Sequence, residues 1–115
     1  MATLRLTRGD TPTFRVGPVT RPDAAGVEQE VDLTGASATM TVRRSLSAAV
    51  SFSVVATFDV ANAFILCKPS AANSESLALG NYVYDVQLTE ADGTKTTFPE
   101  KGHGKLILQP DVTHS

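Results

Sequence analysis

Hydrophobic and polar side chains alternate along several segments of the chain. The two-residue period is clearest at residues 36–43, 51–58 and 82–89, where the apolar positions are Ala36, Ala38, Met40, Val42, Phe52, Val54, Ala56, Phe58, Tyr82, Tyr84, Val86 and Leu88. Successive side chains of a strand point to opposite faces, so each segment predicts a strand with one buried face. The pattern predicts an all-β protein built as an antiparallel β-sandwich, with a barrel or a jelly roll as the alternatives.

Turn-forming residues separate these strands. Residues 17–30 are rich in Gly, Pro and Asp and predict a polar loop or a long hairpin tip, while Asp92-Gly93 predicts a tight hairpin turn. Short links at 46–49 and 59–62 favour antiparallel neighbours. Shorter strands are predicted at 4–6, 11–16, 63–67, 95–98 and 105–109.

One segment departs from the alternation. Ser70 is a favourable N-cap and Gly80 suits a left-handed position after a helix, so we expect one short helical turn near residues 70–79. This turn would cross one end of the sandwich, and Leu77 and Leu79 would close that end.

Tyr82 follows this segment at the place where immunoglobulin-like sandwiches carry a tyrosine corner. In such a corner the tyrosine hydroxyl bonds to backbone a few residues upstream and fixes the crossover between the sheets. Tyr84 is the alternative residue for this role. The placement favours an immunoglobulin-like topology over a barrel.

Length and charge limit the organisation and the partners. We expect the 115 residues to form a single β-sandwich domain spanning 1–115, with 1–7 and 110–115 as candidate docking arms. The formal charge is −2, both signs are interspersed, and Arg43-Arg44 is the only adjacent basic pair, so we expect no nucleic acid partner. Residues 1–5 do not resemble a secretory signal, and no apolar run is long enough for a membrane span, so we expect no membrane partner.

Few residues carry candidate chemistry. Cys67 follows the apolar run 64–66 and is expected to be a buried, unreactive thiol. His103 lies between two glycines and His114 lies near the terminus, and neither has the spacing of a metal ligand. Arg8-Gly9-Asp10 matches the tripeptide of integrin ligands, but an ordinary turn explains it as well.

The remaining candidates also favour simple structural roles. Glu90 and Asp92 bring two carboxylates to a turn, but the oxygens that a calcium loop needs further along are missing. No serine nucleophile motif and no phosphate-binding glycine loop occurs. We therefore expect no enzyme, no catalytic residue, no cofactor and no metal site. The absence of tryptophan and the presence of only two tyrosines argue against a sugar-binding surface.

A series of short motifs occurs in order along the chain. They are Leu6-Thr7-Arg8-Gly9-Asp10-Thr11, Val31-Asp32-Leu33-Thr34-Gly35-Ala36, Leu79-Gly80-x-Tyr82-x-Tyr84-Asp85-Val86-Gln87-Leu88, Asp92-Gly93-Thr94-Lys95-Thr96-Thr97-Phe98, Gly102-x-Gly104 and Asp111-Val112-Thr113. Together they resemble tailed-bacteriophage virion proteins, in particular the N-terminal immunoglobulin-like domain of BppU-type baseplate upper proteins.

The resemblance implies a non-enzymatic structural component of a tailed-phage virion, assembled in the cytoplasm of the bacterial host. It implies a tail, baseplate or fibre-attachment adaptor that contacts other virion proteins and is present in multiple copies in a symmetric assembly. In that family a fibre or receptor-binding part follows the domain, whereas this sequence stops at Ser115. The alternatives are a capsid decoration (cement) protein on the phage head and a soluble module that binds carbohydrate or a host surface protein.

Overall fold

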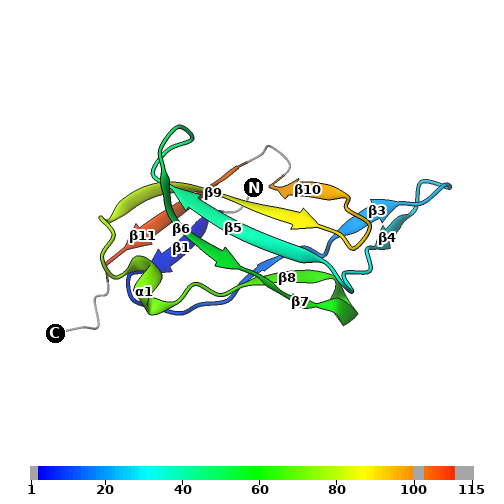
Figure 1. The fold of residues 1–115 in the computed structure, drawn as a ribbon, viewed down its shortest axis with the longest axis horizontal. Coiled ribbons are helices and arrows are strands. Elements are labelled where there is room, and N and C mark those ends of the chain that lie inside the picture. Colours follow the sequence, from blue (N-terminus) through cyan, green and yellow to red (C-terminus); the bar gives the residue numbers. More distant parts are fainter. Residues whose placement is uncertain (1–2, 100–102, 111–115) are drawn as a thin grey trace.

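Two packed β-sheets and a projecting hairpin make up the computed structural model, which describes residues 3–99 and 103–110 (Figure 1). Within these residues the larger sheet contains, in spatial order, β1 (Leu4–Thr7), β11 (Gly104–Gln109), β9 (Gly80–Thr89), β5 (Ser37–Arg43) and β6 (Val50–Val55), with β10 (Lys95–Phe98) paired to β9. The smaller sheet contains β2 (Phe14–Val16), β8 (Phe64–Cys67) and β7 (Thr57–Asp59). The hairpin consists of β3 (Thr20–Pro22) and β4 (Glu28–Glu30).

The predicted antiparallel pairing is confirmed for all pairs but one in the described part of the chain. β9 pairs antiparallel with β5 from Val83 to Thr89, and on its other edge with β11 and then β10. The exception is β1, which runs parallel to β11, with Leu4 opposite Leu106 and Thr7 opposite Gln109. Alternation does not encode strand direction, so the sequence could not show this pair.

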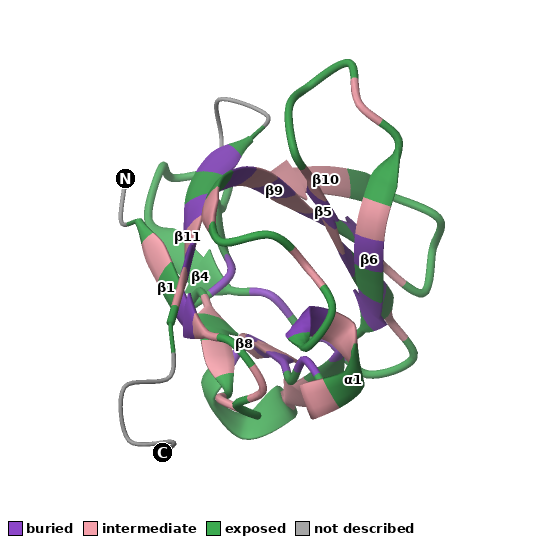
Figure 2. Ribbon diagram, turned by 90° about the vertical axis from the view of Figure 1, so that its left-hand side faces the viewer, coloured by how far each residue is buried: buried purple, intermediate pink, exposed green. Residues whose placement is uncertain are grey.

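The alternating apolar residues meet in the core between the two sheets. Figure 2 shows buried residues on strands of both sheets. Met40 and Val42 of β5, Ile65 of β8, and Val86 and Leu88 of β9 are fully enclosed. Their neighbours on the outer face are half-buried or exposed. The all-β sandwich predicted from the two-residue period is therefore confirmed.

The predicted strand at 51–58 is divided between the two sheets. β6 ends at Val55 and β7 begins at Thr57, and the intervening Ala56 donates its N–H to the carbonyl of Ala38 at 2.9 Å. Both sheets direct their inner faces at the same core. The alternation therefore continues unchanged across the crossing, and this continuity is why one strand was predicted.

A short helical segment follows each of two strands of the smaller sheet, β7 and β8. The turn of 3-10 helix η1 (Val60–Asn62) returns the chain from β7 to β8, and α1 (Ala71–Ser74) confirms the short helical turn predicted near 70–79. Leu77 packs against the core as predicted. The expectation for Leu79 is wrong, because its side chain is 38% exposed and does not close the end of the sandwich.

The tyrosine corner is present. The Tyr82 hydroxyl donates a hydrogen bond to the carbonyl oxygen of Ala78 at 2.6 Å, and the Tyr82 ring is buried. Ala78 lies in the connection between α1 and β9, so the bond fixes the entry into β9. This corner and the strand order identify the sandwich as immunoglobulin-like.

The N-terminal segment is not a detached arm. Residues 4–7 form β1, and Leu6 is fully buried in the core. The short strand predicted at 4–6 is confirmed, but residues 4–7 are part of the sandwich and not a separate arm. An alternation as short as Leu4-Arg5-Leu6 gives too little signal to place the segment inside the core. Of the other candidate arm, only Pro110 is described, and residues 111–115 lie outside the described residues.

Candidate functional site

The β3–β4 hairpin is the most exposed element of the described chain. Every residue from Thr20 to Glu30 is exposed, and the two strands pair only with each other. The hairpin projects from the end of the long axis opposite α1 (Figure 1). The overall dimensions of 55 × 29 × 22 Å reflect this elongated shape. Unpaired strand edges offer backbone donors and acceptors to another chain.

The tip of the hairpin is ordered by one carboxylate. Asp23 Oδ1 accepts the N–H groups of Ala25 at 2.8 Å and Val27 at 3.0 Å, and Oδ2 accepts a bond from the Gln29 side chain at 3.2 Å. These donors, led by the backbone N–H of Val27, hold the pKa of Asp23 below its usual value. The tip therefore presents a fixed turn, with Val27 as an exposed apolar side chain.

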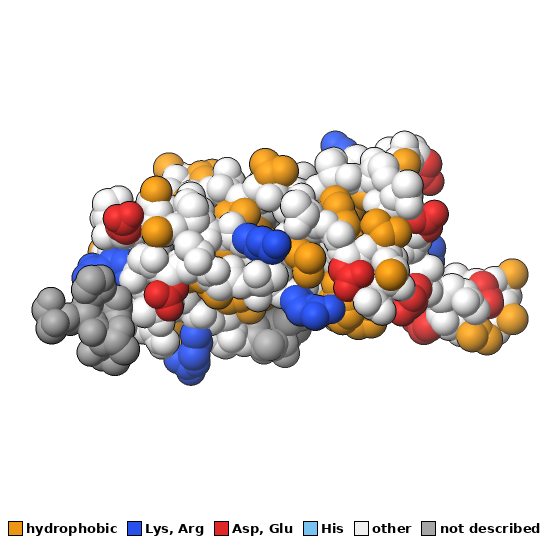
Figure 3. Space-filling view, turned by 90° about the horizontal axis from the view of Figure 1, so that it is seen from below, with side chains coloured by type: hydrophobic (Ala, Val, Ile, Leu, Met, Phe, Trp, Pro, Cys, Tyr) orange, Lys and Arg blue, Asp and Glu red, His pale blue; other side chains and the backbone are white. Residues whose placement is uncertain are grey.

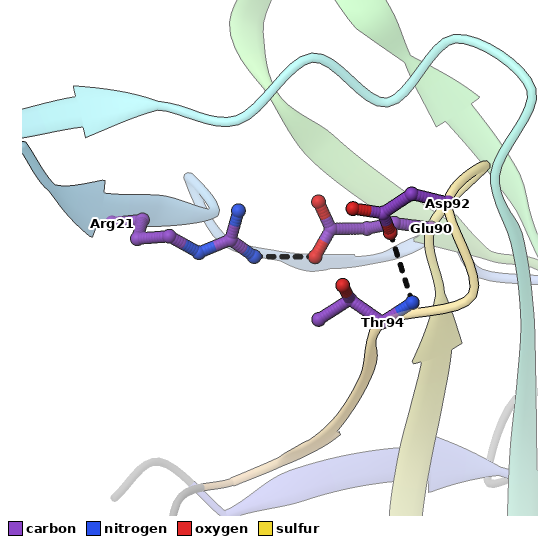
Figure 4. A network of polar contacts seen from close by, with 4 residues as sticks. All are labelled: Arg21, Glu90, Asp92 and Thr94. Atoms are coloured by element: carbon purple, nitrogen blue, oxygen red, sulfur yellow. Dashed lines mark hydrogen bonds and ion pairs between the residues drawn. The ribbon is translucent and has the colours of Figure 1, made fainter.

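The base of the hairpin is anchored in the sandwich. Val19 and Val31 are buried, and the Val31 N–H donates to the Val19 carbonyl at 2.9 Å. On the hairpin itself, Arg21 forms an ion pair with Glu90, which follows β9 (Figure 4). The Glu90 side chain is only 9% exposed, and the ion pair raises the pKa of Arg21. The hairpin is thus held at both its base and its side.

The turn after β9 is an ordinary hairpin turn. Asp92 Oδ1 accepts the N–H of Thr94 at 2.9 Å, a bond that lowers the pKa of Asp92 (Figure 4). Gly93 donates its N–H to the Glu90 carbonyl at 2.9 Å. The hairpin predicted at Asp92-Gly93 is confirmed. Among the described residues, no group of three or more His, Cys, Asp or Glu side chains is placed to hold a metal ion.

Acidic side chains gather at the hairpin end of the molecule. In Figure 3 most of the carboxylates on the face shown lie toward this end, and apolar atoms lie at its tip. The hairpin, its base and the β9–β10 turn contain six carboxylates and two basic side chains: Asp23, Glu28, Glu30, Asp32, Glu90, Asp92, Arg21 and Lys95. The other described residues contain seven basic side chains and four carboxylates. The charge is therefore strongly polarised, although the net charge is small.

A basic hollow lies in the half of the larger sheet remote from the hairpin. Its volume is about 380 Å³, and it is lined by Thr3, Arg44, Asn81, Tyr82, Val83, His103, Gly104 and Lys105. The Arg44 guanidinium stacks on the Tyr82 ring at 4.7 Å from the centroid. Among the described residues that line it, none is a carboxylate. The hollow thus combines a positive rim with the half-buried Val83, while the Tyr82 ring beneath Arg44 is buried.

The residues that the sequence suggested as candidate sites are not brought together by the fold. Arg8-Gly9-Asp10 forms a turn against α1, in which the Gly9 N–H donates to the buried Ser74 hydroxyl at 2.9 Å. His103 is exposed and lines the basic hollow, whereas His114 lies outside the described residues. Cys67 is fully buried as predicted, and burial raises its pKa to about 11.

The hairpin tip predicted within residues 17–30 is confirmed by β3 and β4, whereas the candidate docking arms predicted from the sequence were 1–7 and 110–115. The sequence also places the apolar Val27 between Asp23 and the acidic pair Glu28 and Glu30, a pattern that makes this tip a candidate contact surface. The polarised charge was hidden, because the acidic residues come from two segments, 23–32 and 90–92, that meet only in the fold.

The fold and these two surfaces define a rigid immunoglobulin-like β-sandwich with an acidic hairpin and a basic hollow. No family model and no curated protein matches the chain. Among solved structures, CopC from Methylosinus trichosporium OB3b is similar over 100% of this chain and 88% of its own, with 17% sequence identity and a TM-score of 0.48. In the described part of the chain, no helix has the length and apolar character needed to cross a membrane.

Proposed function

We propose that the protein is a non-enzymatic structural component of a tailed-phage virion, acting as a tail, baseplate or fibre-attachment adaptor through protein contacts. The observation that carries this proposal is the projecting β3–β4 hairpin, which is anchored at its base and exposed from residue 20 to residue 30. The order of the short motifs along the chain, which resembles BppU-type baseplate proteins, supplies the virion context.

The hairpin has the properties of a docking element. Its two free edges accept a further strand, and its tip places Val27 in solvent beside charged residues. Strand addition at a free edge gives affinity through backbone hydrogen bonds, and exposed side chains give specificity. A rigid support lowers the entropy lost on binding, since the hairpin is ordered before contact.

Incorporation into particles tests the proposal. In a phage that encodes the chain, residues 20–30 would be replaced by a short Gly-Ser turn, and purified particles would be analysed by quantitative mass spectrometry. The unaltered chain should be found in particles, and the variant should be lost from them while still folding. A few copies per particle support the adaptor, and hundreds support the decoration protein on the head.

A matched pair of point variants sharpens the test. Val27 and Val55 are both exposed valines, at 55% and 81%, but Val55 lies on β6 and not on the hairpin. We expect Val27→Asp to reduce incorporation and Val55→Asp to leave it unchanged. Absence of the unaltered chain from particles would overturn the proposal, and equal incorporation of both variants would remove the hairpin from it.

A further inference from the structure

The two unusual surfaces of the molecule are opposite in both shape and charge. The hairpin is convex and acidic, and the hollow around Arg44 and Lys105 is concave and basic. The tip and the hollow also share an apolar component, the exposed Val27 on one side and the half-buried Val83 on the other. Complementary potentials of this kind steer association and fix its orientation.

The hairpin cannot reach the hollow of its own molecule. Val83 lies in the first half of β9 and Glu90 directly follows its last residue, so seven residues, or about 23 Å of extended chain, separate them. The ion pair between Arg21 and Glu90 holds the hairpin at the far end of that strand. The hollow that receives a hairpin must therefore belong to another molecule.

We infer that the partner of the β3–β4 hairpin is a second copy of this chain, whose basic hollow receives the acidic hairpin. This inference rests on the proposed role of the hairpin as a docking element, and it identifies the partner that the hairpin binds. In the contact, Glu28 and Glu30 approach Arg44 and Lys105, and Val27 packs near Val83. Because the contact joins two different surfaces, its repetition gives a ring or an open filament.

Salt dependence gives the first measurement. Sedimentation velocity of the full chain over a range of concentrations should show association at about 0.02 M NaCl that is largely lost at about 0.5 M, because salt screens exposed charges. Opposite charge reversals then locate the contact. Glu28→Lys with Glu30→Lys, and separately Arg44→Glu with Lys105→Glu, should each weaken association by about tenfold or more.

Mixing the two double variants gives the decisive test. The first variant carries two basic surfaces and the second carries two acidic ones, so each repels itself. In a mixture, the basic hairpin of the first meets the acidic hollow of the second, and association should return. Glu75→Lys, an exposed charge change on the α1 side, serves as the control and should not weaken association.

Two results would overturn the inference. The first is a chain that sediments as a monomer at every concentration and salt level. The second is association that ignores both charge reversals and is not restored by mixing. Either result leaves the proposed function standing if the hairpin variants still fail to enter particles, because the hairpin would then bind a different virion protein.

Discussion

At the scale of single residues, Tyr82 determines how the chain enters its longest strand. Its hydroxyl bond to Ala78 crosses the connection between α1 and β9, and its ring supports Arg44 at the rim of the basic hollow. One side chain therefore links the corner of the fold to a candidate contact surface. Loss of the Tyr82 hydroxyl should therefore lower the free energy of unfolding.

Tyr82→Phe should lower the free energy of unfolding by about 1 kcal/mol, the usual net contribution of an intramolecular hydrogen bond. Urea denaturation followed by circular dichroism would measure it. Tyr84→Phe is the matched control, since Tyr84 lies on the same face of β9 and its hydroxyl has no hydrogen bond within the described part of the chain. Equal losses for the two variants would contradict the role of the corner.

Burial of Cys67 should make the folded protein less stable as the pH rises into the alkaline range. Its pKa is about 11 in the folded protein because burial disfavours the thiolate, whereas an unfolded thiol titrates near 8.5. Below about pH 8.5 the thiol is protonated in both states, so its contribution is fully present. Between about pH 8.5 and 11 only the unfolded state releases the proton, and stability falls with rising pH by an amount on the order of 3 kcal/mol.

The measurement is a series of urea denaturation curves from pH 8 to pH 11 on the unaltered chain and on Cys67→Ala. The alanine variant is less stable at pH 8, but its stability should fall less as the pH rises. Identical pH slopes for the two proteins would show that Cys67 does not cause the loss.

At the scale of elements, β1 differs most from its sequence expectation. Leu6 is fully enclosed, so Leu6→Ala should cost about 2–5 kcal/mol, as for other large core side chains. Leu79→Ala serves as the control and should change stability by less than about 0.5 kcal/mol, because Leu79 is exposed and outside the core cluster. Thermal unfolding of the two variants compares them directly. A small effect of Leu6→Ala would restore the idea of a loosely attached arm.

The local stability of the β3–β4 hairpin should depend on the ion pair between Arg21 and Glu90. Arg21→Ala removes the ion pair to Glu90, so hydrogen exchange at the hairpin amides should speed up about two- to fivefold. The amides of β9 should keep their protection. Arg15→Ala, which breaks a similar pair to Asp59 on the smaller sheet, is the control and should leave the hairpin unchanged.

The element scale also shows what the sequence could and could not predict. Alternation identified the buried faces of β5, β6 and β9, since Met40, Phe52 and Tyr84 follow a local rule set by the geometry of a strand. It could not identify the crossing at Ala56 or the parallel partner of β1, because both depend on which strands meet and not on which face is buried. The two candidate surfaces were missed for a related reason: each gathers residues from distant segments, as Arg21 with Glu90 and Arg44 with Lys105 show.

At the scale of the whole molecule, the hairpin lengthens an otherwise ordinary sandwich. The radius of gyration is 15.2 Å, whereas a compact domain of this length has about 13 Å. Replacing residues 20–30 by a short turn should move the value toward about 13 Å, measurable by small-angle X-ray scattering at high salt. The melting temperature should change little, because none of these residues is buried. An unchanged radius would mean that the hairpin does not project in solution.

The parallel alignment of β1 with β11 determines how the sandwich resists mechanical force. A pull applied at Leu4 and at Gln109 in opposite directions would slide the two strands along each other, so the pairings from Leu4–Leu106 to Thr7–Gln109 would be strained together in shear. Antiparallel strands pulled at their adjacent ends open one bond at a time, at a much lower force. The β1–β11 pair should therefore resist a pull in this direction more strongly than an antiparallel pair of the same length would resist a pull at its adjacent ends.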